Sequence, residues 1–539
     1  MRLLSFLVAF GIVLAVASPG LGYRTLWADE QETAERGRAI LDTGLPSIYD
    51  PSGNLSVNSA GHEIEEGTLH RYTPWLQFYT ASLGLGIGRH FGLSPDASVR
   101  LPFVVLHAAT SGLVAQGLVG ALSFGVAPAA GIAALYGIGT VRLIHDRTAR
   151  YHALTDFLFM AAWCLFGNFR RKKKTKAAFG STALLGLTLV ALLHSQTIVG
   201  FLGAAIFSIL YFIEERFTRR TALIGLIVGI GACALFALVR PWEQGAIWGS
   251  FGYHKAHGLK SWFEIAYAPF FFVLSFFVLS GFRESPRPTD GWRSELILAC
   301  SLLLSVIIIV RILDFHPYSQ TRYYLPVVGL FLFWPIAIGG PSFAASKMCR
   351  RIYAATFIAI FLCVELGGGT PPFQGLRIVH FDATSETPQP LREVVSKIDG
   401  SGTTGSGVLM DYTPQAVNWY LPRFKPALIP DPTTLSHLGR KNANLPAMVE
   451  PEWHVSYPTT QSGFWVCNDH CDFERIGNPA TSDRYSIRSK TLGKIVNFCV
   501  IGRWKTHQWN NSPFMNYQET ALSPAGSPNG DLVLARRCP

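Results

Sequence analysis

The feature that most constrains this chain is a series of long apolar runs that fills its first two thirds and then stops. Between residues 1 and 366 these runs alternate with short polar connectors, and beyond residue 367 they are absent. A helix needs about 20 mostly apolar residues to cross the hydrocarbon core of a bilayer. The pattern therefore predicts a mainly α-helical, polytopic membrane bundle over 1–366, followed by a soluble α/β domain over 367–539.

Twelve segments are candidates for membrane-spanning helices. They are 3–22, 74–92, 98–121, 124–141, 152–169, 177–194, 197–213, 221–239, 266–282, 296–313, 325–340 and 352–367. We interpret the first as an uncleaved helix, because its apolar run continues past the small residues that would suit signal-peptide cleavage. The outer loop that follows it covers 23–73.

The basic residues predict the topology. The formal net charge is +11. The basic residues form short clusters between the apolar runs, as in Arg170–Lys174. The positive-inside rule explains such clusters without a nucleic acid partner. With 170–176 inside, the other cytoplasmic connectors are 214–220, 283–295 and 342–351, and the C-terminal domain lies outside.

Five candidate spans precede residue 170. If the N-terminus is cytoplasmic and all five cross the membrane, the basic cluster after them would lie outside, against the positive-inside rule. One segment between 74 and 141 must then be partial or broken, which places 142–156 outside. We therefore expect 11 or 13 spans in a plasma (inner) membrane.

The C-terminal domain contains four cysteines, Cys467, Cys471, Cys499 and Cys538. An even number in an extracytoplasmic domain favours one or two disulfides over a zinc site. Helical character over 391–398 and strand patterns over 407–411 and 494–501 indicate a mixed fold. Its many aromatic residues, Trp419 and Tyr420 among them, suit a core better than a sugar-stacking surface.

The first outer loop begins with acidic residues. Asp29 and Glu30 precede an amphipathic stretch that suits a helix resting on the membrane surface. Asp29 could simply cap that helix. The functional alternative is a carboxylate that acts as a general base at the membrane face. Glu65, Glu66 and His70 lie later in the loop and offer contacts to an acceptor or a metal ion, although nothing in their spacing fixes a coordination geometry.

A second polar cluster runs from Arg142 to Asp156 and includes Arg147, Arg150 and Tyr151. Arginines between apolar segments are often a cytoplasmic anchor. The topology above instead places them outside, where guanidinium groups suit a phosphate. Arg322 lies in a third cluster, in the predicted outer loop 314–324.

The order of these motifs resembles the GT-C superfamily of membrane glycosyltransferases, in the branch of lipid A aminoarabinose transferases and protein O-mannosyltransferases. The matching motifs cover about residues 1–366. They are Asp29-Glu30, the stretch 32–44, His70-Arg71-Tyr72-Thr73-Pro74-Trp75-Leu76, Phe91-Gly92 with Arg100-Leu101-Pro102, Arg147–Tyr151 and Arg322–Pro326. Relatives have a Lys and a Pro-Pro pair where this chain has Arg71 and Thr73-Pro74.

The resemblance implies an inverting hexosyl or pentosyl transfer from a polyprenyl-phosphate donor. The acceptor would be a glycan, lipid or protein at the outer face of the cell envelope. Asp29 would deprotonate or orient the acceptor nucleophile, with help from Glu30. Donor-phosphate ligands would be Arg71, Tyr72, Arg147, Arg150, Tyr151 and Arg322.

No cofactor is required by this chemistry, and a divalent metal ion remains an option. The alternative function is a transporter or flippase of lipid-linked saccharides. Such a protein should place charges near mid-membrane in broken helices.

Overall fold

The computed structural model describes a chain in two compact units. The described residues are 1–47, 69–70, 73–171, 177–215, 219–239, 332, 346–367, 373–385, 390–401, 407–410, 414–427, 463–467, 474–476, 484–488, 495–505 and 531–538. The first unit comprises 1–19, 73–77 and 100–380, and the second comprises 20–72, 78–99 and 381–539. The predicted division into 1–366 and 367–539 stays a prediction.

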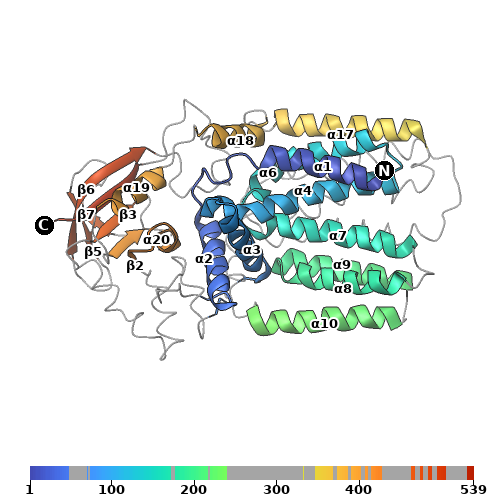
Figure 1. The fold of residues 1–539 in the computed structure, drawn as a ribbon, viewed down its shortest axis with the longest axis horizontal. Coiled ribbons are helices and arrows are strands. Elements are labelled where there is room, and N and C mark those ends of the chain that lie inside the picture. Colours follow the sequence, from blue (N-terminus) through green and yellow to red (C-terminus); the bar gives the residue numbers. More distant parts are fainter. Residues whose placement is uncertain are drawn as a thin grey trace. The chain divides into compact units, whose positions relative to one another are not determined.

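The first unit is built from long helices that run side by side (Figure 1). In chain order the helices that belong to it wholly or in large part are α1 (Arg2–Ala17), α4 (Pro95–Ala121), α5 (Val126–Ile138), α6 (Thr140–Asp146), α7 (Tyr151–Arg171), α8 (Ala177–Leu193), α9 (Thr197–Glu215), α10 (Arg219–Val239), α17 (Lys347–Gly367) and α18 (Gln374–Thr384). Most of these coincide with a predicted apolar segment. Segments 266–282, 296–313 and nearly all of 325–340 lie outside the described residues.

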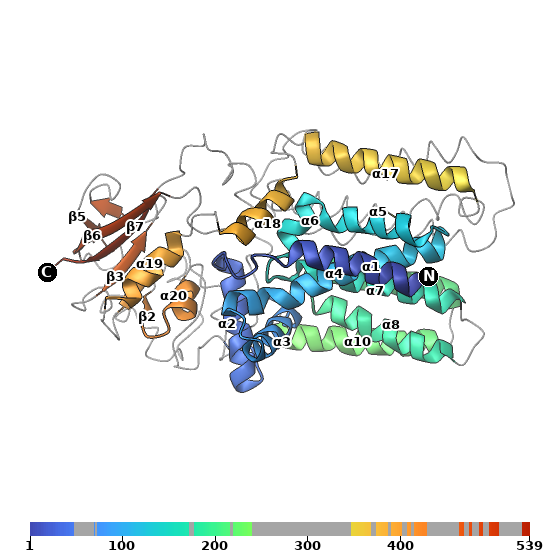
Figure 2. The same ribbon diagram turned by 45° about the horizontal axis from the view of Figure 1, so that its top comes forward.

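Small residues allow these helices to approach closely. Val13, Ala108 and Ala134 form one buried cluster between α1, α4 and α5. A Cβ atom added to Gly137 would lie 2.3 Å from Ser111 Oγ and 2.7 Å from a methyl carbon of Val13. Such contacts are typical of helix packing in membranes, where the hydrophobic effect does not drive association. Helix α5 lies between α1 and α17 (Figure 2).

By length and composition alone, α4 is the one helix among the described residues that could cross a membrane. Helices α5 and α6 meet at a 65° bend and would be a second such element if together they form one broken span. This bend falls in the region where the sequence predicts a partial or broken segment. The predicted total of 11 or 13 spans stays a prediction.

The second unit combines helices with a mixed sheet. Its helices are α2 (Ala28–Thr43), α3 (Leu76–His90, from Phe78 onward), α19 (Pro390–Asp399) and α20 (Pro414–Tyr420). Its strands are β1 (Gly407–Met410), β2 (Lys425–Ala427), β3 (Phe464–Cys467), β4 (Glu474–Ile476), β5 (Arg484–Arg488), β6 (Ile495–Lys505) and β7 (Asp531–Arg537). The predictions of a helix near 391–398 and of strands near 407–411 and 494–501 are confirmed.

The seven strands form one sheet in the order β2-β1-β3-β7-β6-β5-β4. Strand β1 pairs parallel with β2 and β3, and the remaining pairs are antiparallel. Helix α20 connects the parallel strands β1 and β2, so Leu421 and Phe424 enter the same core as Val394 and Ile398 of α19. A disulfide joins Cys499 to Cys538 and so confirms one bond among the predicted cysteines. Cys471 lies outside the described residues.

Candidate active site

The first turn of α2 holds the two acidic residues that the sequence singled out. The helix begins at Ala28, and Trp27 is its N-cap, so the prediction that Asp29 caps this helix is wrong. The carboxylate of Glu30 accepts a hydrogen bond of 3.2 Å from the backbone N–H of Trp27 instead. Glu30 is fully buried, whereas Asp29 is only half-buried. Glu30 therefore stabilises the start of the helix, and Asp29 is the one of the two acidic residues that is partly exposed.

Residues 30–37 of helix α2 are buried although most of them are polar. Glu32, Glu35 and Arg36 are each at most 5% exposed. The charged face that was expected to be open to water is therefore buried, and the location of this helix on the membrane surface stays a prediction. Charged side chains are rarely buried unless they are paired or hydrogen-bonded. The burial of this run indicates that α2 holds a fixed orientation within the unit.

Arg36 and His70 close the first loop on itself. Arg36 donates to Nδ1 of His70 at 3.3 Å and to the backbone oxygen of Ser47 at 3.0 Å. The other ring nitrogen of His70 lies 3.7 Å from Glu32. Since Nδ1 accepts from Arg36, His70 serves this contact and not a metal ion at that nitrogen. No group of three potential metal ligands occurs among the described residues.

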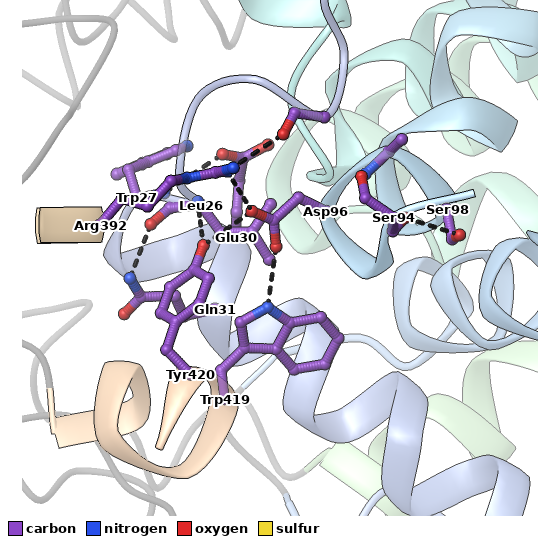
Figure 3. Close-up of polar contacts among 12 residues, drawn as sticks. Leu26, Trp27, Glu30, Gln31, Ser94, Asp96, Ser98, Arg392, Trp419 and Tyr420 are labelled. Carbon is purple, nitrogen blue, oxygen red and sulfur yellow. Dashed lines mark hydrogen bonds and ion pairs between the residues drawn. The ribbon is translucent and has the colours of Figure 1, made fainter. Parts of the chain in front are cut away.

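A network that sequence analysis did not predict surrounds the segment before α2 (Figure 3). Asp96, in the first turn of α4, accepts hydrogen bonds from Trp419 Nε1 at 2.9 Å and from the Tyr420 hydroxyl at 3.1 Å. That hydroxyl in turn accepts from the backbone N–H of Leu26 at 2.6 Å. The aromatic pair at the end of α20 therefore connects Asp96 to the residues directly before Asp29.

Trp419 is a core residue, as the sequence favoured. It is 5% exposed, and the guanidinium of Arg38 lies 4.1 Å from the centre of its ring. Arg38 also donates to the backbone oxygen of Asn418 at 3.2 Å. Helix α20 therefore contacts both the third turn of α2 and the segment that precedes it. The sequence offered one weak signal for this contact, the adjacent Trp-Tyr pair.

A second buried connection joins the first loop to the end of α18. Arg24 and Asp382 form an ion pair with 2.6 Å between Nε and Oδ1, and both side chains are at most 10% exposed. Next to it, the Tyr23 hydroxyl donates to the backbone oxygen of Ser385 at 2.6 Å. Residues 23–26 are thus held at several points by the C-terminal part of the same unit.

The predicted arginine cluster lies in the first unit, at the α6–α7 turn. Arg142 forms an ion pair with Asp156 and lies 3.9 Å from Asp146. His107 contacts Asp146 at 2.8 Å, and its other ring nitrogen lies 2.9 Å from the backbone oxygen of Gly137. All four side chains are at most 4% exposed. Arg142 therefore belongs to a closed ionic network.

Arg147 and Arg150 have different surroundings. Arg147 donates from Nε to the backbone oxygen of Ala17 at 3.0 Å and from Nη2 to that of Pro19 at 2.7 Å. It therefore holds the C-terminal end of α1 with two of its donors. The guanidinium of Arg150 lies 5.5 Å from the ring centre of Tyr151. Both arginines are 8% exposed and Tyr151 is 9% exposed.

The remaining predicted site residues lie outside the described residues. These are Glu65, Glu66, Arg71, Tyr72 and Arg322. The structure thus brings Arg147, Arg150 and Tyr151 together on one turn of the first unit. It also brings Asp29, Glu30 and His70 into the second unit, where Glu30 and His70 make structural contacts.

The chain is similar in fold to ArnT from Cupriavidus metallidurans. The structure of ArnT bound to undecaprenyl phosphate superposes with a TM-score of 0.54 at 11% sequence identity, over 85% of this chain and 92% of ArnT. The apo structure of the same protein gives a TM-score of 0.51 at 12% identity, over 85% and 92% of the two chains. An oligosaccharyltransferase of Archaeoglobus fulgidus, in complex with zinc and sulfate, matches at 12% identity with a TM-score of 0.49, over 86% of this chain and 67% of its own.

No protein-family profile matches the sequence, and no curated protein does. At this identity the likeness establishes the fold. The predicted resemblance is therefore confirmed for the fold, which this chain shares with ArnT.

Proposed function

We propose that this protein is a membrane glycosyltransferase that takes a sugar from a polyprenyl-phosphate donor. The observation that supports this most strongly is the shared fold, over 85% of the chain, with a protein whose structure contains undecaprenyl phosphate. Two further observations support the proposal: the acidic pair Asp29-Glu30 lies in the first turn of α2, and Arg147 and Arg150 are buried at the α6–α7 turn. The donor class proposed here is a lipid-linked phosphodiester.

Asp29 is the general base of the proposed reaction. The acceptor nucleophile gives its proton to the Asp29 carboxylate and forms a bond to the anomeric carbon. The bond between that carbon and the phosphate oxygen breaks, and polyprenyl phosphate leaves with the bonding electrons. Attack from the face opposite the phosphate inverts the anomeric centre. Positioned carboxylates of this kind typically contribute about 10²- to 10⁴-fold to a rate.

Arg150 and Tyr151 are the described residues that we assign to the donor phosphate, with Arg147 beside them. Negative charge grows on the leaving phosphate as the glycosidic bond breaks, and preorganised donors stabilise that charge most effectively in a site from which water is excluded. Arg147 and Arg150 are both 8% exposed. Since Arg147 also holds the end of α1, its loss should disturb the fold as well as the contact to the phosphate. We propose Arg71, Tyr72 and Arg322 as further phosphate ligands.

The proposed acceptor is a glycan, lipid or protein on the extracytoplasmic side, with the N-terminus of the chain in the cytoplasm and the C-terminal residues outside. This orientation rests on the distribution of basic clusters between the apolar segments. It gives Asp29 access to acceptors of the cell envelope and to the sugar of an isoprenoid donor.

Substitution of Asp29 by Asn tests the proposal. We expect transfer from isotope-labelled lipid-linked sugars, extracted from cells that express the protein, to fall by at least about 10²-fold. Binding of undecaprenyl phosphate should be unchanged, because this substitution leaves the phosphate ligands intact. Asp42→Asn is the matched control, because Asp42 lies in the same helix and is exposed. Wild-type transfer by the Asp29→Asn protein would refute the proposal.

A transporter of lipid-linked saccharides is the second candidate, and one observation favours it. Helices α5 and α6 form a broken pair, and α6 contains the buried charges Arg142 and Asp146. Broken helices with buried charges are typical of secondary transporters. Proteoliposomes with a fluorescent lipid-linked saccharide distinguish the two. A transporter moves the lipid between leaflets and leaves the saccharide attached, whereas a transferase releases polyprenyl phosphate.

A further inference from the structure

We propose that Tyr420 is a positioning residue for Asp29, which it controls through the backbone of Leu26. This inference rests on the proposed role of Asp29 as the general base. Tyr420 is far from Asp29 in the sequence and closes the second of two short helices that pack against the sheet. Its hydroxyl lies within hydrogen-bond distance of a backbone group three residues before Asp29.

Two hydrogen bonds of the Tyr420 hydroxyl, to Leu26 and to Asp96, carry the argument, and their chemistry fixes which group donates. A backbone N–H only donates, so the 2.6 Å contact to Leu26 uses a lone pair of the phenol oxygen. The phenol proton then points to Asp96 Oδ2, 3.1 Å away. An ionised carboxylate only accepts, so this direction of both bonds is self-consistent. Asp96 thereby orients Tyr420, and Tyr420 orients Leu26.

The segment from Leu26 to Gln31 is tightly determined by further hydrogen bonds. The backbone oxygen of Leu26 accepts from the Gln31 side chain at 2.6 Å. The N–H of Trp27 donates to Glu30, and the backbone oxygen of Trp27 accepts from the N–H of Gln31 at 2.9 Å. Leu26 is fully buried, so bulk water does not compete with Tyr420 for its N–H in the native structure. The phenol is therefore one of the contacts that hold the segment directly before α2.

Asp29 lies in the first helical turn after this segment, and its direction follows from the backbone of that turn. A displacement of about 1 Å between reacting groups can cost about 10²-fold in rate, even when the substituted residue lies far from the chemistry. Trp419 provides a comparison within the same network. It donates to the other oxygen of Asp96 but has no hydrogen bond to Leu26 among the described contacts.

Tyr420→Phe removes the hydroxyl alone and keeps the packing of the ring. Trp419→Phe removes one hydrogen bond to Asp96 and leaves the bond between Tyr420 and Leu26 in place. We expect Tyr420→Phe to lower the turnover number for transfer from labelled lipid-linked sugars by about 10- to 100-fold. The KM for the donor and the affinity for undecaprenyl phosphate should stay within twofold of wild type. Trp419→Phe should keep most of the turnover number, although its melting temperature should fall at least as much as that of Tyr420→Phe.

Hydrogen–deuterium exchange reports the same contact without an activity assay. In the full-length protein, the Leu26 amide should exchange at least about 10-fold faster in Tyr420→Phe than in wild type, because a buried amide has lost its acceptor. In Trp419→Phe its exchange should be close to wild type. Equal loss of turnover in the two variants, in proportion to their stabilities, would mean that the network only stabilises the fold and would overturn the proposal.

The outcomes also separate this inference from the proposed function. If Asp29→Asn abolishes transfer while Tyr420→Phe retains wild-type turnover and slow exchange at Leu26, the base assignment stands and the positioning role is wrong. If Asp29→Asn retains transfer, the base assignment fails, and the exchange experiment still decides whether Tyr420 controls the start of α2.

Discussion

The ion pair between Arg24 and Asp382 should be strongly coupled, and a double-mutant cycle can measure it. The two residues are 358 positions apart, and their side chains are 10% and 4% exposed. At 2.6 Å and an effective dielectric constant near 20, the direct attraction is about 6 kcal/mol before desolvation is subtracted. Desolvation offsets much of that attraction. Removal of one partner nevertheless leaves a buried charge without compensation, which typically costs about 3–5 kcal/mol.

We therefore expect Asp382→Asn alone to destabilise the protein by about 3–5 kcal/mol. For a unit of this size that corresponds to a decrease of roughly 6–20 °C in melting temperature. The variant Arg24→Gln should show a similar loss. The double variant should lose much less than the sum of the two, since neither charge is then left alone.

The assay is thermal unfolding of the detergent-solubilised, full-length protein, followed by tryptophan fluorescence. Asp399→Asn is the matched control, because Asp399 pairs with Arg423 where both side chains are about half exposed. Exposed pairs typically contribute less than about 1 kcal/mol. Additive losses in the Arg24 and Asp382 variants would show that the two residues do not stabilise each other, and the account of how the first loop is held would be refuted.

Two further changes test other parts of the second unit. Cys538→Ser removes the disulfide to Cys499, which should lower the free energy of unfolding by about 2–4 kcal/mol relative to wild type in chemical unfolding without reductant. Gly20→Ala should destabilise by more than about 1 kcal/mol, because Gly20 has a φ of +70° and an added Cβ would lie 2.4 Å from the backbone of Asp382. A melting temperature equal to wild type for Gly20→Ala would contradict the close approach.

The sequence predicts most of the described helices because the signal for them is local. Apolar runs place α4 and α7 within a few residues of their observed bounds, and the spacing of Leu391, Val394 and Ile398 predicts α19. The strand patterns over 407–411 and 494–501 are also local, and the structure contains β1 and β6 at these positions. The broken pair α5–α6 was expected in outline, since the basic clusters required one irregular segment upstream of residue 142.

The contacts of the candidate site could not be predicted in the same way. Asp96 and Trp419 are 323 positions apart, and neither sequence neighbourhood differs from that of an ordinary helix start or core aromatic. The roles of Asp29 and Glu30 depend on the residue at which α2 begins. If the helix began one or two residues later, a different side chain would cap it and a different acidic residue would be partly exposed. Arg147 illustrates the same limit, because its partners are backbone oxygens at the end of α1.

The ionic network at the α6–α7 turn favours the transferase over the transporter. A transporter that uses buried charges to bind its ion or substrate has to open them to water from each side of the membrane in turn. Here Arg142, Asp146, Asp156 and His107 contact one another in a nearly fully buried group, which suits a rigid scaffold. Between residues 142 and 156 the three arginines exceed the two aspartates by one positive charge. A sugar phosphodiester has one negative charge and gains a second as its glycosidic bond breaks. In the proposed transferase, the surplus of buried arginine at this turn would stabilise that second charge.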